Sequence, residues 1–124
     1  MIKLALTVIW LSAPLSNRAS AQAPPPLACS GHTQYALERC AKRDYDAAHS
    51  ELTRAFQRAV DHATGEDRRR LLDAQSKYLE YEQAHCAWVA ALYRGGSMEH
   101  TQVFACLAEL DRQRVRQLAM GAPD

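Results

Sequence analysis

The chain has 124 residues, which is enough for one domain, and it carries fifteen Lys and Arg against fourteen Asp and Glu. Such a balance excludes the clustered basic surface that nucleic-acid binding requires, so we expect no nucleic-acid partner. The four cysteines form an even number in a short chain, which favours two disulfides over reduced thiols in an exported protein.

Residues 1–21 have the composition of a secretory signal peptide. Lys3 provides the positive start, Leu4 to Leu15 is largely apolar, and Ala19-Ser20-Ala21 is a small-x-small cleavage signal. The apolar run is shorter than the ~20 residues that span a bilayer, and no later segment is longer. We therefore predict a periplasmic or secreted protein with no membrane span.

Residues 22–32 form a Pro-rich lead-in, which we expect to be extended because of Pro24-Pro25-Pro26. A lipidated Cys29 is the alternative to cleavage after Ala21. A lipobox places an aliphatic residue three positions before its cysteine, directly after the apolar run, whereas this chain has Pro26 there. We favour cleavage after Ala21.

A helical domain is predicted over residues 33–120. The first helix, from about Thr33 to Ala63, has apolar residues at spacings of three and four, an amphipathic pattern: Ala41, Tyr45, Ala48, Leu52, Ala55, Phe56, Ala59, Val60 and Ala63. The preceding segment, Ser30-Gly31-His32-Thr33, can provide a turn and the N-cap of this helix.

The second helix is predicted from Thr64, as its N-cap, to about Arg94. It has two adjacent apolar stripes, which predict contacts with two neighbours and a place at the centre of the domain. One stripe is Leu71, Ala74, Tyr78, Tyr81, His85, Trp88 and Leu92; the other is Leu72, Leu79, Cys86, Val89 and Tyr93.

Gly95-Gly96-Ser97 predicts a turn, with Ser97 capping a third helix from about Met98 to Met120. Its expected inward residues are Val103, Cys106, Leu107, Leu110, Val115 and Leu118. The fold class is therefore all-α, a three-helix up-down-up arrangement stapled by two disulfides.

The cysteine positions favour local pairing. Cys86 and Cys106 each lie ten residues from Gly96, so they face each other across the predicted hairpin, which leaves Cys29 to pair with Cys40. The alternative is a crossed pairing that ties the first helix to the hairpin.

From Cys29 to Leu118 the chain resembles the lysozyme inhibitor LprI N-terminal-like family of small exported bacterial helical proteins. The matching residues are Cys40, Leu71, Ala74-Gln75, Tyr78, Ala84, Cys86, Gly95-Gly96-Ser97, Cys106-Leu107 and Arg114 to Leu118. The family usually has Trp at Tyr78, Arg-Asp at Glu82-Gln83, and Asp, Asn and Tyr where His49, Thr53 and Phe56 stand. The resemblance implies a periplasmic or secreted protein with lysozyme inhibition as the named activity.

The sequence motifs give little support for a catalytic site or a metal site. Glu82-x-x-His85 and Asp46-x-x-His49 match the acid-x-x-His pattern of di-iron bundles, but the inward Glu residues that such a site also needs are missing. We expect a solvated Glu82 and a partly buried His85. The serines lack a Gly-x-Ser-x-Gly elbow, so we predict no enzyme, no cofactor and no metal.

Two features of the predicted surface are candidates for binding. The run Arg68-Arg69-Arg70 is typical of a solvated helix face balanced by Glu66, Asp67 and Asp73. The aromatic residues Tyr78, Tyr81, Trp88 and Tyr93 have the spacing of core residues, although Tyr and Trp also dominate binding hot spots.

The hairpin tip, Arg94-Gly95-Gly96-Ser97, is the segment best shaped to protrude into a partner. We expect binding to lysozyme or a related wall-cleaving enzyme, with Arg94 approaching its catalytic carboxylates. The alternative is a structural or interaction module of the periplasm with no lysozyme activity.

Overall fold

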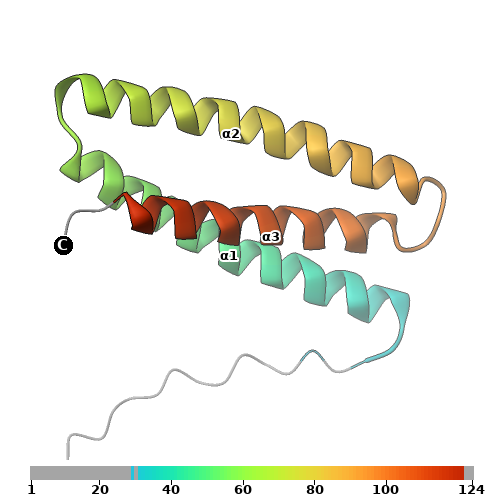
Figure 1. Ribbon diagram of the computed structural model, residues 1–124. Helices are drawn as coiled ribbons and strands as arrows, with labels where there is room; N and C mark the ends of the chain where they lie inside the picture. Colours follow the sequence, from blue (N-terminus) through green and yellow to red (C-terminus); the bar gives the residue numbers. More distant parts are fainter. Residues whose placement is uncertain (1–28, 30, 122–124) are drawn as a thin grey trace, which may run out of the picture.

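The structure, a computed structural model, describes Cys29 and residues 31–121, so the predicted signal peptide and most of the lead-in lie outside the described residues. Three helices follow one another up, down and up: α1 (Gln34–His62), α2 (Gly65–Leu92) and α3 (Glu99–Met120) (Figure 1). The all-α prediction is confirmed. No helix in this described part has the length and apolarity needed to cross a membrane.

Helix α3 is the central element, and the prediction that the second helix occupies the centre is wrong. Figure 1 shows α3 between the other two, and its packing against α1 is the more extensive of its two interfaces. Helices α1 and α2 contact each other only near their shared turn. The cause is that much of the apolar surface of α2 faces solvent, so its two stripes do not correspond to two neighbours.

The main core lies between α1 and α3. Leu52 and Ala55 of α1 and Leu118 of α3 are buried together, and partly buried Phe56 and Val115 pack against them. Full burial of one such leucine stabilises the fold by roughly 2–3 kcal/mol. The apolar period predicted for the first helix therefore marks its buried side.

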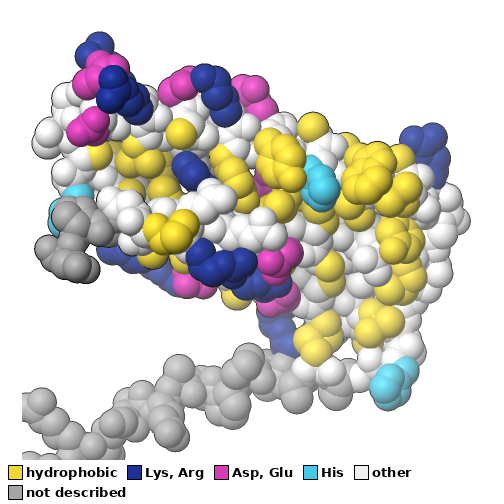
Figure 2. Space-filling view, viewed as in Figure 1, with side chains coloured by type: hydrophobic (Ala, Val, Ile, Leu, Met, Phe, Trp, Pro, Cys, Tyr) yellow, Lys and Arg dark blue, Asp and Glu magenta, His cyan; other side chains and the backbone are white. Residues whose placement is uncertain are grey.

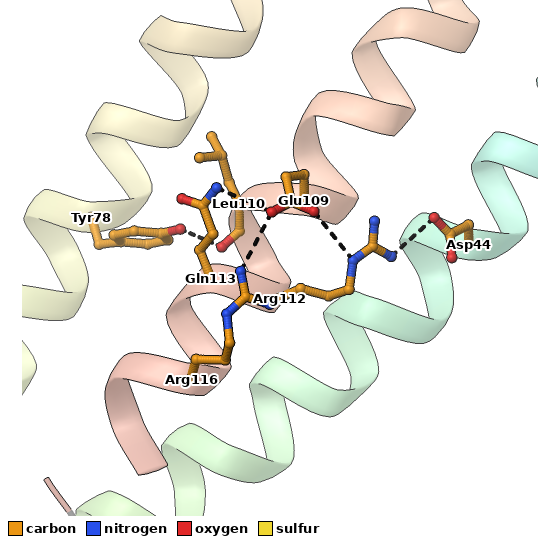
Figure 3. Close-up of polar contacts among 7 residues, drawn as sticks. All are labelled: Asp44, Tyr78, Glu109, Leu110, Arg112, Gln113 and Arg116. Carbon is orange, nitrogen blue, oxygen red and sulfur yellow. Dashed lines mark hydrogen bonds and ion pairs between the residues drawn. The ribbon is translucent and has the colours of Figure 1, made fainter. Parts of the chain in front are cut away.

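Polar contacts reinforce the same interface at its solvent edge. Arg112 of α3 donates to Asp44 of α1 at 3.0 Å, and Glu109 accepts from Gln113 at 3.1 Å and from Arg116 at 3.4 Å (Figure 3). These groups lower the pKa of Glu109, the hydrogen bond from Gln113 having the largest effect. Exposed pairs of this kind add little stability, and of these contacts only Arg112–Asp44 joins α3 to α1.

The predicted helix caps are confirmed at one of three positions. Thr33 Oγ1 accepts from the Ala36 N–H at 3.2 Å. Thr64 makes no capping bond with its side chain, and Met98 rather than Ser97 is the N-cap residue of α3. At the tip the Gly95 N–H donates to Glu99 at 3.1 Å instead, so a carboxylate from the first turn of α3 closes the loop without Ser97.

Both disulfides join the cysteines that local pairing predicts. The Cα atoms are 5.6 Å apart for Cys29–Cys40 and 5.8 Å apart for Cys86–Cys106. The first ties the lead-in to α1, and the second ties the C-terminal part of α2 to α3. Because α2 contacts α1 little, its place depends on α3, to which the second disulfide ties it.

Candidate functional site

The hairpin tip is an exposed turn on a rigid base. Gly95 has a φ of 73°, a conformation that residues with a Cβ rarely adopt, and the Gly96 N–H donates to the Tyr93 carbonyl at 2.8 Å. Arg94 is exposed and makes no hydrogen bond or ion pair within the described residues. Its guanidinium is therefore available to a partner.

A row of rings runs along the outer side of α2 toward this tip. The ring centroids of Tyr81 and His85 are 5.5 Å apart, and those of His85 and Trp88 are 5.6 Å apart. Tyr81 is 52 % exposed, Trp88 58 % and Leu92 61 %. We call the outer side chains of Tyr81, His85, Trp88 and Leu92 the aromatic face. The predicted place of Tyr81, Trp88 and Leu92 in the core is wrong, since none of the three described helices covers them, whereas His85 is partly buried as expected.

The aromatic face is almost free of charge. Between Tyr81 and Tyr93 the only acidic or basic residues are His85 and Glu82, and Glu82 is turned inward. Figure 2 shows a histidine between apolar patches along α2 and charged side chains gathered over the other half of that helix. Aromatic residues without nearby charge are typical of the centre of a protein–protein interface, and Arg94 adds a polar edge.

The inner side of α2 is unusually polar for a packed helix. Gln75 and Glu82 are buried along with Cys86, and half-buried Tyr78 lies between the two polar residues. Gln75 accepts from Arg114 Nε at 2.9 Å, and the Tyr78 hydroxyl donates to the Leu110 carbonyl of α3 (Figure 3). Hydrogen bonds thus hold the middle of α2 to α3 and fix the direction of the aromatic face.

Glu82 forms a buried cluster with residues of both other helices. It is 5 % exposed, and it hydrogen-bonds to Asp111 of α3, which is fully buried. Asp111 Oδ2 also lies 3.1 Å from Nδ1 of His49 on α1. Burial, and then the charge and hydrogen bond of Asp111, raise the pKa of Glu82 to about 7. The expectation of a solvated Glu82 is therefore wrong.

This cluster contains two neighbouring carboxyls, as a catalytic acid pair does, but both are closed to a substrate. Glu82 Oε2 and Asp111 Oδ1 lie buried, and no described N–H or O–H donates to them. Tyr78 closes one side, and burial followed by the charge of Glu82 raises its pKa to about 12. Because a substrate cannot reach these carboxyls, we assign the cluster to the packing of α2.

The acid-x-x-His motifs do not assemble a metal site. His85 belongs to the outer aromatic face whereas Glu82 points inward, and Asp46 pairs with Lys42 at 2.7 Å rather than with His49. No group of three His, Cys, Asp or Glu side chains in the described ranges is placed to hold a metal ion.

The basic run at the start of α2 is a solvated face. Glu66 pairs with Arg69, and Arg70 lies 3.6 Å from Glu66 and 3.7 Å from Asp67. This confirms the predicted balance of charges at the first turn. Asp73, expected to contribute, pairs with Lys77 at 2.6 Å.

Sequence reasoning missed the inward polar residues Gln75, Glu82 and Asp111. A signal for the first two was present: Leu71, Gln75, Tyr78, Glu82, Cys86 and Val89 recur at spacings of three and four. This series of residues includes Cys86, and the disulfide of Cys86 requires that side of the helix to face α3.

The family model described as "Lysozyme inhibitor LprI" matches residues 28–118. An uncharacterized protein of Rhizobium meliloti (strain 1021) is 33 % identical over 113 residues, which cover 81 % of this chain and 81 % of that protein. No solved structure matches the chain.

Proposed function

The chain belongs to the lysozyme inhibitor LprI family, and from that premise we propose that it inhibits lysozyme or a related wall-cleaving enzyme by binding it. The observation that carries this proposal is the uncharged aromatic face of α2, which is exposed and ends beside the unpaired Arg94. The family is named for inhibition, so we propose a binding protein and no enzyme. The chemistry of the buried cluster agrees, since its carboxyls are closed to substrate.

The proposed contact matches the chemistry of a glycosidase cleft. Such enzymes have two carboxylates flanking the scissile bond in a groove that binds sugar rings. Tyr81 and Trp88 would occupy part of that groove with flat rings, and Arg94 would bind a catalytic carboxylate through two N–H groups. The disulfide Cys86–Cys106 keeps the tip rigid, which lowers the entropy cost of binding.

We propose export to the periplasm or the medium, with cleavage after Ala21. Support comes from two formed disulfides, which persist in oxidising compartments, and from the family. The sulfur of Cys29 is bonded to Cys40, so it is not free to carry a lipid. Mass spectrometry of the mature protein should find Gln22 at the N-terminus; a diacylated Cys29 would overturn this assignment.

The test of inhibition compares the oxidised protein with two variants in a wall-suspension clearing assay with c-type lysozyme. We expect Arg94→Ala and Trp88→Ala each to weaken inhibition about 10-fold or more, since each removes a central contact. Arg68→Ala is the matched control, because it removes the same charge at the far, exposed end of α2. It should inhibit as the parent does.

Two results would contradict the proposal. No inhibition by the parent protein at large molar excess would exclude c-type lysozyme as the target. Equal inhibition by the parent and both tip-side variants would exclude this surface. A non-lysozyme envelope protein that is retained by the parent and lost by Trp88→Ala would favour the alternative, an interaction module that uses the same aromatic face.

A further inference from the structure

The end of the molecule opposite the hairpin tip contains a groove that the proposed function does not use. It has a volume of about 610 Å³ and lies among the last turns of α1, the first turns of α2 and the last turns of α3. Pockets of about 300–1,000 Å³ are typical of small-molecule sites. Figure 2 shows apolar side chains in the hollow between α2 and α3 near this end.

The floor of the groove is apolar because α1 has small residues there. Ala55, Ala59 and Ala63 line one wall, and Leu71 of α2 and Leu118 of α3 line the others. Alanine side chains cannot fill the space between helices that diverge, and α2 contacts α1 little beyond their shared turn. The hollow thus results from alanine spacing combined with the splay of α2.

The rim of the groove is basic. Arg58 and His62 of α1 line it, and neither makes a hydrogen bond or ion pair within the described part of the chain. Arg114 of α3 stands opposite. It donates to Gln75 through Nε at 2.9 Å and to Gln117 through Nη1 at 3.0 Å, and it lies over the ring of Tyr78, whose centroid is 5.1 Å away, so its Nη2 group is left for a ligand. The one acidic residue of the lining, Asp67, lies 3.7 Å from Arg70. The rim therefore has an uncompensated positive charge.

We propose that this groove binds one amphipathic carboxylate, an alkyl chain that carries a single anionic head group. The chain lies on the alanine and leucine floor, and the carboxylate accepts hydrogen bonds from Arg58 and from the preorganised Arg114. A cation is excluded by the charge of the rim, and a polyanion would require more bases than these. This inference stands independently of lysozyme binding, because the groove and the aromatic face lie at opposite ends of α2.

The probe is dodecanoate below its micelle concentration, titrated into the oxidised protein and followed by calorimetry and by amide NMR shifts. We expect one site, with shifts confined to residues around Ala59, Leu71 and Leu118. Arg58→Glu should weaken binding at least 10-fold, and Arg54→Ala, an exposed arginine one turn away and outside the groove, should change it less than twofold. Ala59→Phe should abolish binding by filling the hollow. Far-UV circular dichroism verifies that each variant is folded.

The head group and the location are tested separately. Dodecyltrimethylammonium has the same chain with the opposite charge and should not bind. Equal binding of that cation, undiminished binding to Arg58→Glu, or shifts confined to Tyr81 and Trp88 would each overturn the proposal. Concentration-dependent dimerisation that Ala59→Phe removes would also overturn it, because the groove would then hold a second copy of the chain.

Discussion

The raised pKa of Glu82, which is buried beside Asp111, predicts that the protein loses stability as the pH rises. The pKa of Glu82 is raised from 4.5 to about 7 in the folded chain. A raised pKa means that the folded state binds the proton more tightly than the unfolded state does. The contribution of this proton to the free energy of unfolding is fully present below about pH 4.5, and it is lost as the pH rises through about 7.

The size of the loss follows from the shift. Each pKa unit corresponds to 1.36 kcal/mol, so a shift of this size represents roughly 3 kcal/mol if the structure around the pair stays unchanged. Helix α2 packs against only one neighbour along most of its length and can yield, which lets water reach the ionised pair. We therefore expect a loss of about 2 kcal/mol between pH 5 and pH 8.

The assay is urea unfolding of the oxidised protein, followed by far-UV circular dichroism at several pH values. Glu82→Gln should remove most of the loss, because its amide donates to Asp111 at every pH, and at pH 8 it should exceed the parent in stability by about 2 kcal/mol. Glu80→Gln, an exposed position on the same helix, is the control and should follow the parent.

Three neighbours of the pair have ionisable side chains: His49, Tyr78 and Tyr45. His49 faces Asp111 Oδ2 at 3.1 Å and is half exposed, so His49→Gln, measured in parallel, separates its contribution. Burial raises the pKa of Tyr78 to about 12, and burial followed by the charge of Asp111 raises that of Tyr45, so both tyrosines keep their protons in this range. A flat stability profile for the parent, or an equal slope for parent and Glu82→Gln, would refute the reasoning.

Replacing both Cys86 and Cys106 by Ser should lower the free energy of unfolding by about 3 kcal/mol in urea, because the bond closes a loop of 20 residues. Gly95→Ala should cost about 1–2 kcal/mol in the same assay, since its φ of 73° is strained for any residue with a Cβ. Ser97→Ala should cost less than about 0.5 kcal/mol, because Ser97 makes no capping bond; a loss near 1 kcal/mol would restore it as the cap. Leu118→Ala should cost about 3 kcal/mol by opening a cavity in the α1–α3 core, without changing the pH profile.

Much of the fold could be predicted from local patterns. Gly and Thr positions marked the helix ends to within about two residues, and the apolar period of α1 identified its buried side. The ten-residue symmetry of Cys86 and Cys106 about Gly96 predicted a disulfide that the structure contains. These features depend on residues close in sequence, so single-chain reasoning reaches them.

The placement of α2 and the nature of its two sides could not be predicted in the same way. An apolar stripe says that a face is apolar but not whether another helix covers it, and here Trp88 and Leu92 face solvent. Conversely, Glu82 and Asp111 are residue types that are rarely buried, and here they are buried beside each other, where burial and Asp111 raise the pKa of Glu82. That meeting joins residues 29 positions apart and is not encoded in either helix alone.

The polar inner side of α2 has a consequence for how the molecule responds to heat. Heat capacity rises on unfolding mainly because apolar surface becomes exposed, whereas exposure of polar groups lowers it. Detachment of α2 from α3 would expose Gln75, Glu82 and Tyr78 together with a limited apolar area. The outer aromatic face of α2 is already exposed to solvent in the folded protein. Such a detachment has a small heat-capacity change and a small dependence on urea, so its free energy curves less with temperature and falls less with urea than that of global unfolding.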